Sequence, residues 1–327
     1  MSSCGRIVST VALAAVAGCL WAPPVQAAGS AAEGTCDGRT VTVTGTDGDD
    51  VIDGSPGDDV IAALAGDDVI RGHGGNDVIC GGDGSDRLRG GPGDDRLFGE
   101  SEAAAPGDAL VGGAGDDYLD VGGTYFFDDI YYRGEPAGIH ADLQTGIVTT
   151  SRGTDTIVRT TRTPVVWGSR NADVIEGSDG PNLIYGRAGD DTLIGRGGSD
   201  YLYGDDGDDM VIGGAGTDYT LSGGPGDDVL RSGGDDGYTT GVYGGQGDDH
   251  LIGTPGFDYG LYGGDGNDWI EGFGSADRIY GGPGDDRLDG GTGYDKGFAS
   301  DGFDTCISIE RRKDCEEHPP LSGGQQP

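Results

Sequence analysis

The sequence has few of the residues that form an ordinary globular core. Only 34% of its 327 residues are hydrophobic, whereas glycine occurs 71 times. A chain of this length would normally form one to three domains, each with its own apolar centre. This composition does not describe such domains and favours a solenoid, in which each turn buries only a few side chains.

Positive charge is also scarce. The chain has 20 lysines and arginines against 58 aspartates and glutamates, a formal net charge of −38. Nucleic acids and anionic membranes require basic patches, which the sequence lacks, so neither is an expected partner. Self-repulsion of this size opposes compaction unless cations neutralise the carboxylates. Multivalent cations are therefore the expected ligands.

Signatures of catalysis are missing as well. The sequence contains no HExxH zinc motif and no GxSxG nucleophile turn, and no non-repeat segment is long enough for a catalytic domain. The chain has four histidines, which disfavours zinc. His73 and His250 lie inside repeats, and His140 has no nucleophile near it in the sequence. We therefore expect a protein that is not an enzyme.

The only long apolar run lies near the start of the chain. Arg6, the apolar residues 7–21 and the small-residue site at 25–27 predict a signal peptide over residues 1–27. An alternative reads residues 16–19 as a lipobox, with lipidated Cys19 tethering the protein to the cell surface. Either way the protein is expected outside the cytosol, and no later run is long enough to span a bilayer.

Four cysteines follow the predicted signal peptide, an even number in an oxidising compartment. They allow three pairings. The preferred one joins Cys36 to Cys80, because Cys80 follows a core position and points outward by strand alternation. Cys306 and Cys315 would then close a loop at the other end of the chain. Unpaired structural thiols are the alternative.

What the sequence has in abundance is a nine-residue repeat, G-G-x-G-x-D-x-U-x, in which U is a large aliphatic residue. Residues 81–99, GGDGSDRLRGGPGDDRLFG, contain two units. The pattern predicts a first block over residues 36–120, a non-repeat β spacer over 121–167, a second block over 168–305, and a disulfide-closed cap with a disordered tail over 306–327. Residues 40–44, TVTVT, are expected to form a leading strand over the first coil.

The repeat has a physical interpretation. Its glycines permit a turn in which carbonyl oxygens point inward and the position-six aspartate adds a carboxylate. The next three residues form a short strand with only U in the core, so two units make one 18-residue coil of a parallel β-roll. Coils stacked about 4.8 Å apart place equivalent turns on either side of a shared cation. Calcium, which accepts six to eight oxygens, suits that environment better than magnesium.

The predicted metal ligands are the aspartates at position six. Asn182 replaces aspartate in one unit, and the enlarged unit 233–243 has no clean equivalent. Asp108 and Asp304 occupy the same position in irregular units. The predicted ligands are Asp50, Asp59, Asp68, Asp77, Asp86, Asp95, Asp117, Asp173, Asp191, Asp200, Asp209, Asp218, Asp228, Asp249, Asp258, Asp268, Asp277, Asp286 and Asp295.

These units resemble the hemolysin-type, or RTX, calcium-binding nonapeptides of secreted bacterial proteins, over most of residues 45–120 and 168–304. The spacer segment AGIHADLQTGIVTTSRGTDTI also resembles segments between such blocks. The resemblance implies an all-β parallel β-roll that binds several calcium ions and folds when it meets calcium outside the cell. The predicted amino-terminal signal differs from the carboxy-terminal export signal of many family members, so the export route does not carry over.

The residues at position nine of the repeat differ between the two faces of the predicted roll. In the second block one face reads Tyr185, Tyr203, Leu221, Tyr243, Tyr262, Tyr280 and Phe298. The other face reads Glu176, Ile194, Ile212, Arg231, Ile252, Glu271 and Asp289. We expect the tyrosines to form a stabilising ladder, with a surface for polysaccharide or a cell-surface protein as the alternative. The spacer aromatics are expected to pack as a plug between two rolls rather than to bind a ligand.

The leading functional hypothesis is a secreted calcium-binding module with a structural, adhesive or surface-interaction role. The alternative is a non-catalytic companion or relic of a secreted RTX hydrolase of the protease or lipase type. An ice-binding adhesin is disfavoured, because positions seven and nine lack regular rows of threonine.

Overall fold

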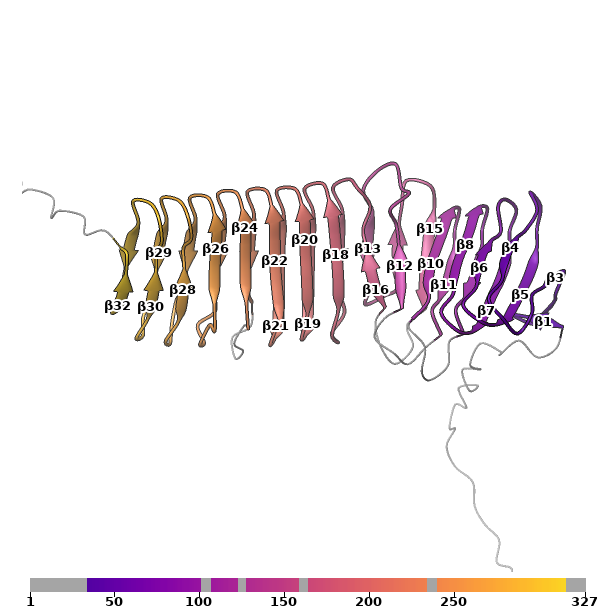
Figure 1. Ribbon diagram of the computed structural model, residues 1–327, viewed down its shortest axis with the longest axis horizontal. Coiled ribbons are helices and arrows are strands. Elements are labelled where there is room, and N and C mark those ends of the chain that lie inside the picture. Colours follow the sequence, from indigo (N-terminus) through magenta and orange to yellow (C-terminus); the bar gives the residue numbers. More distant parts are fainter. Residues whose placement is uncertain (1–33, 101–106, 123–127, 159–163, 234–239, 316–327) are drawn as a thin grey trace, which may run out of the picture.

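The computed structural model describes residues 34–100, 107–122, 128–158, 164–233 and 240–315. Within these ranges the chain forms only strands and turns. They build an elongated parallel β-solenoid of about 14 turns of roughly 18 residues each (Figure 1). The all-β roll predicted from the repeat is therefore confirmed.

Two long sheets form the opposite faces of the solenoid, and the repeat supplies them alternately because successive nine-residue units lie on opposite sides of each coil. We call them sheet I and sheet II. In spatial order from the amino-terminal end, the 14 strands of sheet I are β4 (Val51–Asp53), β6 (Val69–Arg71), β8 (Arg87–Pro92), β10 (Ala109–Ala114), β12 (Asp129–Tyr131), β16 (Val165–Trp167), β18 (Leu183–Ala188), β20 (Tyr201–Asp206), β22 (Thr220–Pro225), β24 (Val242–Gln246), β26 (Leu261–Asp265), β28 (Arg278–Tyr280), β30 (Lys296–Phe298) and β32 (Arg311–Lys313).

Sheet II holds 16 strands. In spatial order they are β3 (Val43–Thr44), β5 (Val60–Ala65), β7 (Val78–Asp83), β9 (Arg96–Phe98), β11 (Tyr118–Asp120), β15 (Thr154–Val158), β14 (Ile147–Thr149), β13 (His140–Asp142), β17 (Val174–Glu176), β19 (Thr192–Gly198), β21 (Met210–Gly216), β23 (Val229–Arg231), β25 (His250–Ile252), β27 (Trp269–Glu271), β29 (Arg287–Asp289) and β31 (Thr305–Ile307).

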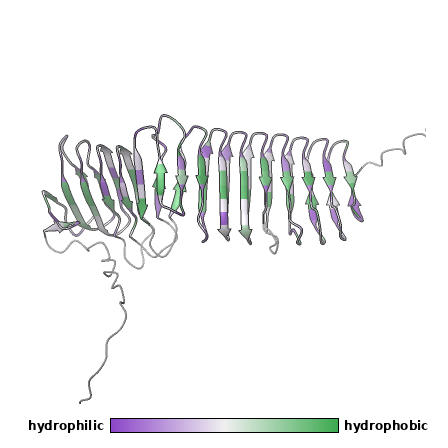
Figure 2. Cartoon of the chain, turned by 180° about the vertical axis from the view of Figure 1, so that it is seen from behind, coloured by the Kyte–Doolittle hydropathy of each residue, from purple (hydrophilic) through white to green (hydrophobic). Residues whose placement is uncertain are grey.

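The core is a thin layer between the two sheets. Each regular strand turns its position-eight side chain inward, as period-two alternation predicts. Ile184, Leu193 and Leu202, from three successive strands, are fully buried. Hydrophobic colour accordingly concentrates on the strands (Figure 2). Because each coil contributes only two large core residues, each depends on its neighbours to cover them.

The spacer continues the solenoid. Its strands β12 and β16 extend sheet I in parallel register, while β13, β14 and β15 insert antiparallel pairings into sheet II. The described part of the spacer is therefore not the predicted plug between two rolls, because both sheets run through it without a break. Of its aromatics, Tyr132 is buried and Tyr131 stacks on Trp167. Tyr125, Phe126 and Phe127 lie outside the described residues.

Both predicted disulfides are present, Cys36–Cys80 and Cys306–Cys315. The first attaches the hairpin of β1 (Thr35–Cys36) and β2 (Arg39–Thr40) to the outer face of sheet II, where Cys36, Cys80 and Phe98 form a small buried cluster. The predicted leading strand over residues 40–44 is instead divided, because only Val43–Thr44 pairs with β5.

Two further predictions fall outside the described ranges: the signal peptide over residues 1–27, with Cys19, and the tail after residue 315. In the part of the chain that the structure covers, no helix is both long and apolar enough to cross a membrane.

Candidate functional site

The position-six aspartates gather into two rows, one along each edge of the solenoid, where the turns enter the strands. Row I precedes the strands of sheet I and row II those of sheet II. Row I contains Asp50, Asp68, Asp86, Asp108, Asp128, Asn182, Asp200, Asp218, Asp258, Asp277 and Asp295. Row II contains Asp59, Asp77, Asp95, Asp117, Asp155, Asp173, Asp191, Asp209, Asp228, Asp249, Asp268, Asp286 and Asp304.

One carboxylate oxygen of most row members joins adjacent coils. The backbone N–H of Asp191 donates to Oδ1 of Asp209 at 2.7 Å, and the N–H of Asp209 donates to Oδ1 of Asp228 at 2.7 Å. Row I repeats the pattern, as from Asp68 to Asp86 at 2.9 Å. Each such bond spans one coil, so the carboxylates hold the turns in register.

The second carboxylate oxygen of most row members, Oδ2, is buried without a hydrogen-bond partner. Apart from Asp50 and Asp59 in the first coils, every predicted ligand is at most 2% exposed. Within the described ranges, Oδ2 has no hydrogen-bond partner in Asp68, Asp77, Asp86, Asp95, Asp117, Asp191, Asp200, Asp209, Asp228, Asp249, Asp268, Asp277, Asp286, Asp295 and Asp304. A buried acceptor without a partner costs about 1–3 kcal/mol, and more when it is charged. A positively charged ligand beside these oxygens would remove that cost.

Glycine at position one keeps the space beside Oδ2 open. A Cβ atom built on Gly195 would clash with both Asp200 Oδ2 and the carbonyl oxygen of Gly213 in the next coil. Position two turns the chain with a positive φ, 129° at Gly91, for example, a conformation that favours glycine. The glycines therefore shape a small oxygen-lined space that any larger side chain would fill.

Asn182 shows which oxygens surround that space. Its Oδ1 accepts from the N–H of Ser178, so its amide nitrogen faces the turn. That nitrogen lies 2.6–3.3 Å from the carbonyl oxygens of Ser178 and Gly180, from that of Gly195 in the next coil, and from Asp200 Oδ1, which share its two N–H donors. Four oxygens from two coils thus converge on one point, which the NH₂ group occupies here.

Not all turns leave Oδ2 without a partner. In four turns a serine or threonine at position two donates its backbone N–H to Oδ2 of the position-six aspartate, at 2.6–3.0 Å. We call these capped turns, and the turns of the unpartnered aspartates open turns. The capped pairs are Thr46–Asp50, Ser55–Asp59, Ser169–Asp173 and Thr254–Asp258.

Burial raises the pKa of several open-turn carboxyls. The pKa of Asp191, Asp249 and Asp277 rises to about 8, first because burial disfavours the charged form and then because neighbouring carboxylates repel it. The pKa of Asp86 and Asp95 rises to about 7 for the same reasons. Without a bound cation these groups would hold protons near neutral pH.

The ligand set suits a hard cation. Among the described residues no three His, Cys, Asp or Glu side chains converge, so a cation here would take carbonyl oxygens as well as one or two carboxylates. Calcium accepts that mixture in flexible geometry, whereas zinc prefers nitrogen and sulfur. The residues present therefore fit calcium.

Comparison with known families agrees with this geometry. A family model described as the RTX calcium-binding nonapeptide repeat, in four copies, matches residues 44–79, 81–102, 167–202, 185–219, 220–238, 242–259 and 261–296, more than half of the chain. The chain belongs to the RTX calcium-binding nonapeptide repeat family. The RTX repeats imply calcium binding, and their roll is a structural calcium-binding fold. No curated protein matches the chain.

The rows of this RTX protein include residues that the repeat pattern did not assign as ligands. Asp128 and Asp155 lie in the spacer yet continue the rows, because each accepts from the aspartate N–H of the preceding coil. Each stands two residues before a buried isoleucine, and this D-x-U spacing was the available signal. At the carboxy-terminal end Glu310 accepts from the N–H of Asp295 and takes the place of an aspartate in row I.

A second set of carboxylates was also missed. The position-five side chains at the outer rim accept backbone N–H groups from the following coil, as Asp208 accepts from Asp227 and Asp227 from Asp248. These bonds run in the direction opposite to those of row II. The frequent Asp-Asp pairs were their signal in the sequence, and the exposed position explains why no cation is needed to satisfy them.

The position-nine asymmetry is present on sheet I as an aromatic row of stacked rings. Neighbouring centroids lie 3.9–5.5 Å apart in two runs. The prediction that Leu221 belongs to this row was wrong. A one-residue insertion places Leu221 in the core and pairs Ser222 with Tyr203. The runs are Tyr131, Trp167, Tyr185 and Tyr203, then Tyr243, Tyr262, Tyr280 and Phe298. The register predicted for the other face, from Glu176 to Asp289, is confirmed.

Proposed function

We propose that this protein is an exported calcium-binding module whose open turns bind several calcium ions and whose roll folds when they do. The observation that carries the proposal is the repeated buried Oδ2 without a partner, facing carbonyl oxygens of the next coil. Each turn supplies part of the oxygen ligands of a calcium ion and the next coil supplies the rest, as the oxygens around Asn182 illustrate. Calcium binding and the stacking of coils therefore occur together.

Charge supports the same mechanism. With a net charge of −38, the free chain repels itself, and the burial of two rows of carboxylates adds to that cost. Calcium at the open turns offsets both the repulsion between carboxylates and the cost of burying them. Extracellular calcium modules typically bind at about 10⁻⁴–10⁻³ M, which keeps such a chain loose inside a cell and folded outside it.

Export is proposed from the signal-like residues 1–27 and from the two disulfides, since disulfides persist in oxidising compartments. Lipid attachment at Cys19 is the alternative form of the same proposal. RTX repeat proteins are typically secreted.

The role we propose is structural, adhesive or surface-interacting rather than catalytic, with polysaccharide or a cell-surface protein as the partner. The repeats and the short spacer offer no recognised catalytic motif, and the stacked aromatic row supplies a contact surface on sheet I. A companion or relic of an RTX hydrolase is the runner-up, and no specific contact favours it.

Calcium titration followed by circular dichroism tests the proposal. At pH 8 the full chain in chelator should lack β structure and gain it cooperatively as calcium reaches about 10⁻⁴–10⁻³ M. Magnesium at the same concentration should leave it unfolded, because it requires tight octahedral geometry and gives up water reluctantly. A β signal that is insensitive to chelator would reject the mechanism.

A further inference from the structure

The aromatic row on sheet I has one interruption, at Ser222. In register, Tyr203 of β20 pairs with Ser222 of β22, which pairs with Tyr243 of β24. On one side Tyr203 stacks on Tyr185 with centroids 4.8 Å apart, and on the other Tyr243 stacks on Tyr262 at 4.9 Å. Between the two tyrosines the strand carries only a small hydroxyl side chain.

This interruption exposes ring faces that the rest of the row covers. Within each run the rings are nearly parallel, 6–18° apart, so every inner ring has a neighbouring ring against each of its two faces. Tyr203 and Tyr243 each turn one face toward Ser222. Tyr243 is accordingly 43% exposed. Two coil steps separate these faces by about 9.6 Å, which leaves room for one further ring at the spacing of the row.

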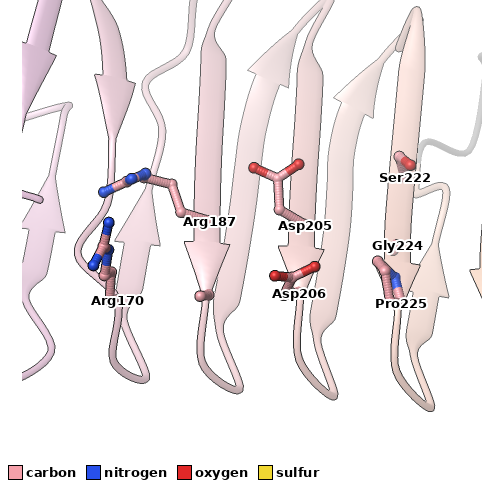
Figure 3. A pocket seen from close by; sticks show the side chains of 9 residues that line it. Arg170, Arg187, Asp205, Asp206, Ser222, Gly224 and Pro225 are labelled. Carbon is pink, nitrogen blue, oxygen red and sulfur yellow. The ribbon is translucent and has the colours of Figure 1, made fainter.

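A groove of about 560 Å³ adjoins this slot (Figure 3). Arg170 and Arg187 lie at one end, Asp205 and Asp206 in the middle, and Ser222 and Gly224 at the other end. Within the described ranges neither arginine forms an ion pair, and Arg187 makes only a long hydrogen bond, 3.4 Å, to the carbonyl oxygen of Ser169.

Two of these charged residues occupy strained positions. Arg187 and Asp205 stand at position two, where glycine is the commonest residue, with φ angles of 90° and 71°. Arg187 and Asp205 are direct cross-strand partners. Leu64 and Arg196 have a similar positive φ, but each of them pairs with a glycine in the next coil. Strained backbone persists where the surrounding structure enforces it, often at ligand sites. Here it places a cation and an anion side by side at the groove.

We propose that the slot binds one pyranose ring of an acidic oligosaccharide. The ring's C–H faces pack against Tyr203 and Tyr243, its hydroxyl groups donate to Asp205 and exchange hydrogen bonds with Ser222, and the carboxylate of the adjoining sugar binds Arg187 and Arg170. The aromatic side chain of a peptide would fill the slot equally well, but its edge would bury against a hydroxyl and a carboxylate without hydrogen bonds. Sugar hydroxyls satisfy those groups.

This inference deepens the proposed surface-interaction role and rests on it, because the slot exists only in the folded roll. Isothermal titration calorimetry of the full chain in saturating calcium, with circular dichroism of the same sample, tests it. The probe is a trimer of glucuronic acid, with its methyl ester as the uncharged match. We expect the acid to bind and the ester to bind at least tenfold more weakly.

Three variants sharpen the test. Ser222→Tyr completes the stack and should abolish binding without lowering the melting temperature. Arg187→Gly relieves the strained backbone and should weaken binding at least tenfold. Tyr262→Ser opens a second gap in the row, away from Arg170 and Arg187, and should leave the affinity unchanged.

Several outcomes would overturn the inference. They are equal affinity for acid and ester, full binding by Ser222→Tyr, and binding of N-acetyl-tryptophan amide but not of the trimer. If the roll folds with calcium but binds no sugar, the inference fails and the calcium proposal stands. If the roll does not fold with calcium, both fail.

Discussion

At the scale of single residues, position two decides how a turn satisfies its aspartate. A residue with positive φ there, glycine in many units and Arg187 in the unit of Asp191, leaves Oδ2 of the aspartate without a partner, whereas Ser169 in the unit of Asp173 donates its own N–H to that oxygen. Asp173 and Asp191 are neighbours in row II and represent the two types of turn. The repeat pattern alone treats them as equivalent ligands.

Replacing Asp173 and Asp191 by asparagine, one at a time, distinguishes capped from open turns. Asp191→Asn should lower the number of bound calcium ions by one or two while the roll stays folded, because an amide NH₂ can donate to carbonyl oxygens of its own turn and of the next coil, as that of Asn182 does. Asp173→Asn, whose carboxylate is already capped by Ser169, should lose none. Atomic absorption on desalted protein measures the ratio, and equal losses in the two variants would contradict the distinction.

At the scale of elements, the β1–β2 hairpin is the clearest addition to the repeating coils. It lies on the outer face of sheet II, held by the Cys36–Cys80 disulfide and by an ion pair of 2.7 Å between Asp37 and Arg96. The Arg96 guanidinium in turn packs 4.1 Å from the ring centroid of Tyr118. The hairpin thus links the first coils to the middle of the first block.

Removing that disulfide should destabilise the amino-terminal coils. The bridge spans 44 residues, and closing a loop of that size contributes about 4 kcal/mol in the chain-entropy model. We expect Cys36→Ser with Cys80→Ser to lower the free energy of unfolding by about 2–4 kcal/mol and to accelerate hydrogen exchange in β3 to β9.

The matched control is Cys306→Ser with Cys315→Ser. That bridge spans only nine residues, so its loss should cost less, and the faster exchange should appear in β29 to β32. Uniform acceleration along the whole solenoid in either variant would show that the coils unfold as one unit instead.

At the scale of the whole molecule, two buried rows of carboxylates make stability depend on protons and calcium together. The pKa of Asp191 and Asp249 rises from an ordinary value near 3.8 to about 8 in the folded chain. The folded state therefore binds more protons than the unfolded state between these values. Its stability without calcium is fully present below about pH 4 and is lost as the pH rises through 6 to 8.

In chelator we accordingly expect β structure at pH 4–5 that fades between pH 6 and 8, measured by circular dichroism. Calcium should restore it at pH 8, and the calcium concentration required should rise on acidification, since protons compete for the same oxygens. A calcium-free signal that stays constant, or grows, from pH 5 to 8 would contradict this linkage.

The repetitive part of this protein follows from its local sequence pattern. A strict nine-residue register places one aliphatic residue inward and one aspartate at each turn, so the parallel roll, its core and the rows of carboxylates follow from local chemistry. The same periodicity placed Cys80 on the outer surface and predicted its pairing with Cys36. Each of these inferences needs only residues within one or two units.

Features that depend on contacts between coils could be seen only in the folded chain. Asp128 and Asp155 join the rows through bonds spanning 20 and 38 residues, a separation that the irregular spacer hides. A one-residue insertion moved Leu221 into the core and left Ser222 in the aromatic row. The slot and its strained arginine exist because cross-strand register, set by hydrogen bonds between coils, brings those positions together. The nine-residue period predicts a regular coil. Where a residue is inserted or the period is lost, the position of each side chain is set by hydrogen bonds to the adjacent coils.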